Sequence, residues 1–168
     1  MSTESVESVK STKTMKELFV EMLLYLLDET FENVHGVYLD GGTSLFETLA
    51  TISSDEASRP VSATCASLSA QVEHVRFYLD RTIEFAQGRN PGPADWQEIW
   101  RTVREVTPEQ WETSKQHLRE TYGRVLDLVK TFDGWEEVDG ALGSAVGMIV
   151  HTAYHLGEIR QALCTLKS

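Results

Sequence analysis

Apolar residues return every three or four positions along four long stretches of the chain, the spacing that places them on one face of an α-helix. The stretches cover residues 14–34, 62–87, 107–132 and 140–166. No stretch alternates apolar and polar residues for long enough to predict a β-strand. The pattern therefore predicts an all-helical chain.

Short local signals mark where these helices begin and end. Thr107 precedes a proline and lies three residues before Gln110, which is typical of a helix N-terminus. The sequence Asn-Pro-Gly-Pro at 90–93 interrupts the chain between the second and third stretches. Ser44 with Glu47 forms a candidate capping box, which predicts a short helix within the connection.

Four long amphipathic helices predict an all-α four-helix bundle, with a long helix-containing connection at 37–61 between the first and second helices. We expect one domain over residues 14–168, preceded by a polar tail at 1–13. The first half of the last helix carries apolar residues on every side, namely Ala145, Val146, Met148, Ile149, Val150 and Ala153. We interpret this half as buried all round, either at the centre of the bundle or at a subunit interface, and the second alternative predicts a homodimer.

The net charge of −11 limits the binding partners that we expect for this protein. An acidic surface repels nucleic-acid phosphates and anionic membranes, and no basic stripe is present, so we expect neither partner. The most apolar run, residues 18–27, contains Glu21 and is too short to span a bilayer. Because no signal peptide is recognisable either, we expect a cytoplasmic protein.

Three histidines are the main candidates for chemistry. His151 and His155 lie one helical turn apart, so that both imidazoles leave the same helix face and can reach one ion. The pair alone also fits two packed or solvated histidines. His74, in the middle of the second long helix, is the best candidate for a third ligand. His35 and His117 are interpreted as surface residues.

Other residues are candidates for supporting roles at the same site. Glu158, one turn beyond His155, either accepts the outer N–H of that ring or is a solvated carboxylate. Tyr154 and Tyr78 flank the histidine faces as candidate donors to a developing oxyanion. Arg81, one turn beyond Tyr78, is a candidate for orienting a carboxylate of a substrate or cofactor.

Two pairs of residues bear on how such a site would work. Trp96 and Trp100 either roof the pocket or cap the hydrophobic end of the bundle. Cys65 and Cys164 point away from the histidines on the helical wheel, so they are predicted to be ordinary core or surface residues. Any thiol that takes part in the chemistry would therefore come from outside the protein.

The segment His-Thr-Ala-Tyr-His-Leu-Gly-Glu-Ile-Arg-Gln at 151–161 resembles the fourth-helix signature of the DinB-like proteins, the DinB/YfiT superfamily. In that family a histidine of the second long helix joins the two in the fourth to bind a divalent metal, and His74 stands at the matching position. The resemblance implies one metal ion on His74, His151 and His155, with zinc or nickel expected. It also implies a fold shared with transferases and isomerases that use low-molecular-weight thiols.

Two functional hypotheses follow. Three neutral imidazoles leave an ion its full charge and an open position, which favours a metal-dependent enzyme acting on a small molecule as a thiol-dependent transferase or as a hydrolase. The alternative is a non-catalytic module in which the ion staples two helices, with a role in sensing or in a stress response.

Overall fold

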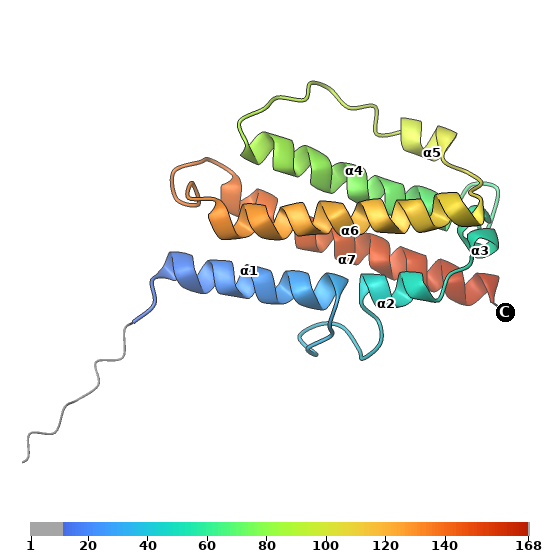
Figure 1. Ribbon diagram of the computed structural model, residues 1–168, viewed down its shortest axis with the longest axis horizontal. Helices are drawn as coiled ribbons and strands as arrows, with labels where there is room; N and C mark the ends of the chain where they lie inside the picture. Colours follow the sequence, from blue (N-terminus) through green and yellow to red (C-terminus); the bar gives the residue numbers. More distant parts are fainter. Residues whose placement is uncertain (1–11, 168) are drawn as a thin grey trace, which may run out of the picture.

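The computed structural model describes residues 12–167, and these residues form an all-helical fold without strands (Figure 1). Most of the predicted polar tail, residues 1–11, lies outside the described part, as does residue 168. The helices are α1 Met15–Phe31, α2 Leu45–Ala50, α3 Ser54–Ser58, α4 Leu68–Ala86, α5 Glu98–Thr102, α6 Pro108–Thr131 and α7 Ala141–Leu166.

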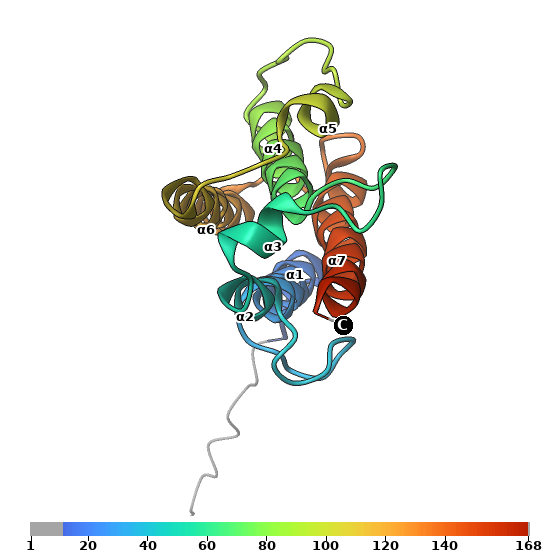
Figure 2. The ribbon, with the colours of Figure 1, turned by 90° about the vertical axis from the view of Figure 1, so that its right-hand side faces the viewer.

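The four long helices pack side by side around one hydrophobic core. Both α4 and α1 pack against α6 and α7, and Figure 2 shows the four helices nearly end-on. In Figure 1, α1 and α7 run in one direction, whereas α4 and α6 run in the other. The antiparallel neighbours α4 and α7 therefore face each other at their middle turns, where the candidate histidines lie.

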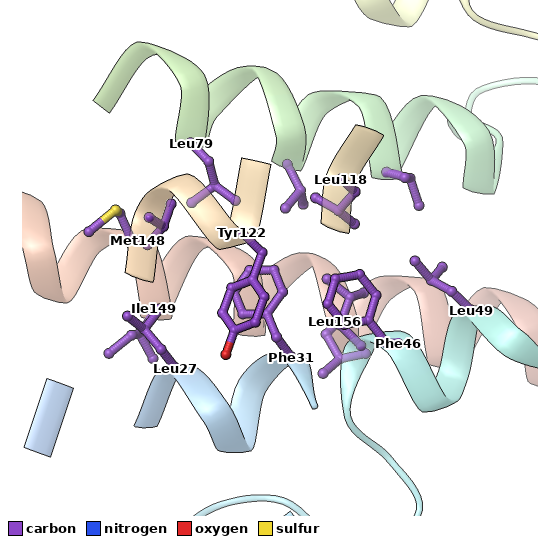
Figure 3. Close-up of a cluster of buried hydrophobic side chains, with 14 of the residues drawn as sticks. Leu27, Phe31, Phe46, Leu49, Leu79, Leu118, Tyr122, Met148, Ile149 and Leu156 are labelled. Carbon is purple, nitrogen blue, oxygen red and sulfur yellow. The ribbon is translucent and has the colours of Figure 1, made fainter. Parts of the chain in front are cut away.

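The core is built from the predicted apolar faces (Figure 3). Phe31 of α1 stacks on Tyr122 of α6 with ring centroids 4.4 Å apart. Leu79 of α4 and Leu156 of α7 are also fully enclosed. The buried indole of Trp111 donates a hydrogen bond of 2.8 Å to the carbonyl of Ile52. This contact fastens the connection that follows α2 to the start of α6.

Several predicted helix ends are confirmed and two are wrong. Thr107 caps α6, and the capping box of Ser44 opens α2. The first helix ends at Phe31 instead of residue 34, because the N–H of Asn33 bonds to the carbonyl of Asp28 and closes a wider turn. The second long helix begins at Leu68 instead of residue 62, because the Ser67 side chain accepts from the N–H of Ala70 and caps the helix there.

A buried carboxylate shapes the turn after α1. Glu29 is fully enclosed, and its side chain accepts hydrogen bonds from the backbone N–H groups of Val37, Tyr38 and Leu39 at 2.9–3.1 Å. Burial raises the pKa of this carboxyl, but the three backbone donors outweigh burial and hold the pKa below its ordinary value. A charged side chain thus fixes a loop that has no regular structure of its own.

The prediction that the first half of α7 is buried all round is wrong within the single chain. Ala145 and Met148 are buried, but Val146 is 47% exposed and Val150 is 60% exposed. They lie on the side of α7 that its neighbouring helices leave open, so a central position does not explain their apolar character. Among the described helices, none is long and apolar enough to cross a bilayer.

Candidate metal centre

Two antiparallel helices bring the three predicted histidines together. His74 lies in the middle of α4, and His151 and His155 lie one turn apart in α7. One nitrogen from each ring lies within 4.8 Å of the other two, so the three residues could hold a metal ion. The Nε2 atoms of His74 and His151 are 3.2 Å apart. Tetrahedral coordination with metal–nitrogen distances of 2.0–2.1 Å needs a separation of about 3.3–3.4 Å, so this pair fits a tetrahedral edge.

The three imidazoles are neutral at physiological pH. Burial is the main cause, and repulsion from His155 adds to it, so that the pKa of His74 falls to about 4. The pKa of His151 falls to about 4 for the same reasons, with a further contribution from His74. Burial also lowers the pKa of His155, although the carboxylate of Glu158 opposes that shift. Neutral rings keep the nitrogen lone pairs that a metal requires.

The outer nitrogen of His155 is held by two acceptors. Its Nδ1 lies 2.5 Å from Oε1 of Gln71 and 2.9 Å from Oε2 of Glu158. A proton on Nδ1 leaves the Nε2 lone pair free for a metal. A contact of Glu158 with His155 was one of two alternatives given by the sequence, whereas the contact of Gln71 was not predicted. The place of Gln71 on α4 one turn before His74, on the same helix face, was the available signal.

The outer nitrogens of the other two rings lack such support. The Nδ1 atoms of His74 and His151 are buried and have no hydrogen-bond partner within residues 12–167. His155 is therefore the ring whose orientation hydrogen bonds fix, while the other two are oriented by packing against aromatic side chains.

Aromatic rings enclose the triad, and they include both predicted tryptophans. The Trp100 ring lies against His74 with centroids 4.4 Å apart, and Trp96 meets the same imidazole edge-on at 5.9 Å. Of the two alternatives for these tryptophans, the roof over the histidines is thus confirmed. The segment between α4 and α6, which includes α5, carries both rings across the site.

The predicted tyrosines differ in how they meet the triad. Tyr78 stacks on His151 with ring centroids 3.8 Å apart, and burial raises its pKa. Its hydroxyl lies against α7 at Gly147, where an added Cβ would be 2.9 Å from the Tyr78 oxygen. Tyr154 is 62% exposed and touches His155 edge-on at 5.1 Å. A hydrogen bond to Glu158 and its charge raise the pKa of Tyr154.

Arg81 already has partners. Its guanidinium donates to the carbonyl of Gly92 and lies 5.5–5.8 Å from the ring centroids of Phe77, Phe85 and Trp96. These contacts tie the segment after α4 back onto α4. In this structure the side chain therefore supports the roof, and a role toward a substrate carboxylate stays a prediction.

The two remaining histidines are surface residues, as predicted. His35 bonds to Asp28 at the end of α1, and His117 is exposed on α6. Cys65 and Cys164 are free and exposed. Cys65 precedes α4, so the prediction of its direction from the helical wheel is wrong. It borders a pocket that Tyr154 and Glu158 also line.

No protein-family model, curated protein or solved structure matches the chain. Its function is therefore argued from the site itself.

Proposed function

We propose that this protein is a DinB-like four-helix bundle that binds one divalent metal ion through His74, His151 and His155. We further propose that it is an enzyme whose reaction depends on this ion. The observation that carries the proposal is the convergence of three neutral imidazoles from α4 and α7. Zinc and nickel are the expected ions, because imidazole ligands suit both. The resemblance of residues 151–161 to the DinB-like signature supports the same assignment.

The surroundings of the triad suit a metal-dependent transferase or hydrolase for a small molecule. A bound divalent ion would supply Lewis-acid activation of water or of an incoming thiol. Tyr154, exposed beside His155, is placed to donate a proton or a hydrogen bond to a substrate oxygen. Both cysteines are free and exposed, and the thiol nucleophile of such a reaction would be an external low-molecular-weight compound.

The alternative is a metal-stapled module without catalysis, with a sensing or stress-response role. The specific observation in its favour is the roof, because the Trp100 ring lies directly on His74 and restricts access to the triad. In this role the ion would link α4 to α7 and stabilise their packing.

Metal analysis of untagged protein, purified without added metal, tests the shared part of both hypotheses. We expect about one equivalent of a divalent metal in the wild type and none in His151→Ala. His117→Ala is the matched control, because His117 is exposed on another helix and should leave the metal content unchanged. A wild-type protein that fails to take up zinc or nickel on titration would contradict metal binding.

Two further measurements separate the enzyme from the staple. A ligand at 100 times its dissociation constant adds about 2.7 kcal/mol to stability. For a chain of this size, we expect chelation to lower the melting temperature of the wild type by roughly 5–10 °C and that of His151→Ala hardly at all. Metal-dependent turnover of esters, or of electrophiles with an added thiol, would support the enzyme. Metal-dependent stability without turnover across both panels would support the staple.

We further propose that two copies associate through α1 and α7. These neighbouring helices expose apolar residues at helical spacings, which are Met15, Leu18, Met22 and Tyr25 on α1 and Leu142, Val146 and Val150 on α7. The α7 row extends over about two turns, or about 12 Å. A two-fold dimer buries the same face of both copies, and this face carries apolar residues that no part of the described chain covers.

A further inference from the structure

A cavity lies at the end of the fold where α4 and α6 end and α7 begins. It has a volume of about 190 Å³ and is lined mostly by apolar side chains from these helices and from the loop between α6 and α7. Phe85 and Ala86 come from α4, Leu128 from α6 and Met148 from α7, and Phe132 directly follows α6. A cavity of about 150 Å³ with a similar apolar lining is known to hold benzene, so this one has room for a single-ring compound.

One buried polar group in the cavity wall has no partner. Trp135 lines the cavity and is 5% exposed, and its Nε1–H has no acceptor within residues 12–167. Phe19 and Phe132 meet the indole edge-on at 5.4 and 4.8 Å, so packing holds the ring in place. Buried donors are nearly always satisfied in native proteins, so an indole N–H without an acceptor among residues 12–167 leaves a position for an external acceptor.

The loop that carries Trp135 is closely packed against the end of α6. A Cβ on Gly134 would lie 2.8 Å from Val138 and 2.9 Å from Phe132. The N–H of Val138 bonds to the carbonyl of Gly134 at 3.0 Å. Because a larger residue at 134 would displace both neighbours, this wall of the cavity is a built feature of the fold.

The charge around the cavity limits the ligand class. Asp139 is among the lining residues, and the same loop contains Glu136 and Glu137. Among residues 12–167, no arginine or lysine lines the cavity. An anionic ligand would therefore meet repulsion without compensation, whereas a neutral one would not.

We infer that this cavity binds a neutral, single-ring or similarly compact apolar compound whose carbonyl or ether oxygen accepts the Nε1–H of Trp135. No histidine of the triad lines this cavity, so the two sites are separate. The cavity residue nearest in α4 is Thr82, one turn beyond Tyr78, and Tyr78 in turn stacks on His151. The inference does not depend on metal binding.

Three probes of similar size test the inference on the wild-type chain. Acetophenone has the acceptor oxygen, ethylbenzene lacks it, and benzoate carries a negative charge. The indole N–H signal of Trp135 in ¹H–¹⁵N spectra, assigned by its loss in Trp135→Phe, reports on the contact. We expect acetophenone to shift this signal with a dissociation constant in the millimolar range, roughly three- to tenfold tighter than ethylbenzene and also tighter than benzoate.

Variants locate the binding. Ala141→Leu places a larger side chain on a partly buried residue of the cavity wall and should weaken acetophenone at least about tenfold. Ala162→Leu makes the same change on a partly buried residue near the other end of α7 and should leave the affinity unchanged. In Trp135→Phe, followed through the Met148 methyl signal, acetophenone and ethylbenzene should bind about equally.

His151→Ala separates this inference from the proposed metal function, because it removes a metal ligand but should still bind acetophenone like the wild type. Equal affinities of acetophenone and ethylbenzene for the wild type would overturn the inference. So would the absence of any shift of the Trp135 indole signal with all three probes.

Discussion

The two acceptors at the outer nitrogen of His155 lead to a quantitative prediction about metal affinity. Gln71 and Glu158 lie 2.5 and 2.9 Å from the same Nδ1, which carries one proton when Nε2 binds a metal. Either acceptor can satisfy that proton when the other is removed. We therefore expect the effects of Gln71→Ala and Glu158→Ala to be strongly coupled.

The expected loss of zinc affinity depends on whether one or both acceptors of the His155 N–H are removed. Each single variant keeps one acceptor, so it should weaken zinc binding only about two- to fivefold, with Glu158→Ala at the upper end because its acceptor is charged. The double variant leaves a buried N–H without a partner, which costs about 1–3 kcal/mol. That cost corresponds to a loss of affinity of roughly 5- to 160-fold. We expect the loss to lie above about 25-fold, the largest product of the two single effects, because the two acceptors share one proton.

The assay is competition for zinc with a chromophoric chelator, carried out on the wild type and the three variants at one pH. Circular dichroism controls for folding. Glu120→Ala, at an exposed position of α6, controls for the loss of one negative charge. Single effects that simply multiply in the double variant would refute the shared-proton reasoning. An unchanged affinity in the double variant would refute any role of these acceptors at the site.

Three other perturbations have outcomes set by the structure. Gly147→Ala should displace the Tyr78 ring and weaken zinc binding about three- to tenfold. Its effect on stability should stay below about 1 kcal/mol, because alanine favours the helix. Gly157→Ala is the control, because position 157 has open space around it, and its zinc affinity should equal that of the wild type in the same competition assay. Val146→Glu should convert the proposed dimer to a monomer in light scattering, and a monomeric wild type would contradict the dimer. Glu29→Gln should lower the free energy of unfolding at pH 7 by about 1–3 kcal/mol. Because the folded-state pKa of Glu29 lies below its unfolded value, the wild type should lose this advantage as the pH falls below about 4.3, so denaturant titrations of the two proteins should converge in acid.

Local signals in the sequence predicted local features of the fold well. The cap at Thr107 and the capping box at Ser44 involve residues three positions apart, so they can be recognised without knowledge of the rest of the chain. The start of α4 at Leu68 was missed because the apolar spacing of 62–87 extends through Ser67, whose capping contact the periodicity does not reveal. The early end of α1 was missed because the bond between the N–H of Asn33 and the carbonyl of Asp28 is not visible in the apolar spacing.

At the candidate site, too, the sequence predicted what depends on neighbouring positions and missed much of what depends on the packing of helices. His151 and His155 share a face of one helix, so their proximity follows from helical geometry alone. The closeness of His74 to them is a tertiary contact. The sequence pointed to His74 as the best available third histidine and through the resemblance to the DinB-like proteins. The contact of Gln71 with His155 and the roof formed by Trp100 also depend on how α4, α5 and α7 pack, which periodicity does not specify.

The distance in sequence between the ligands has a consequence for how the chain would acquire metal. His74 and His151 are 77 positions apart, and all of α6 lies between them. Bringing two such positions together in an unfolded chain costs roughly 4 kcal/mol of loop-closure entropy. In the folded protein, the packing of α4 against α7 offsets this cost before any metal binds. A nascent or unfolded chain would therefore offer only the weak local pair in α7. Tight metal uptake would then report that the last helix has docked, and would mark the end of folding rather than initiate it.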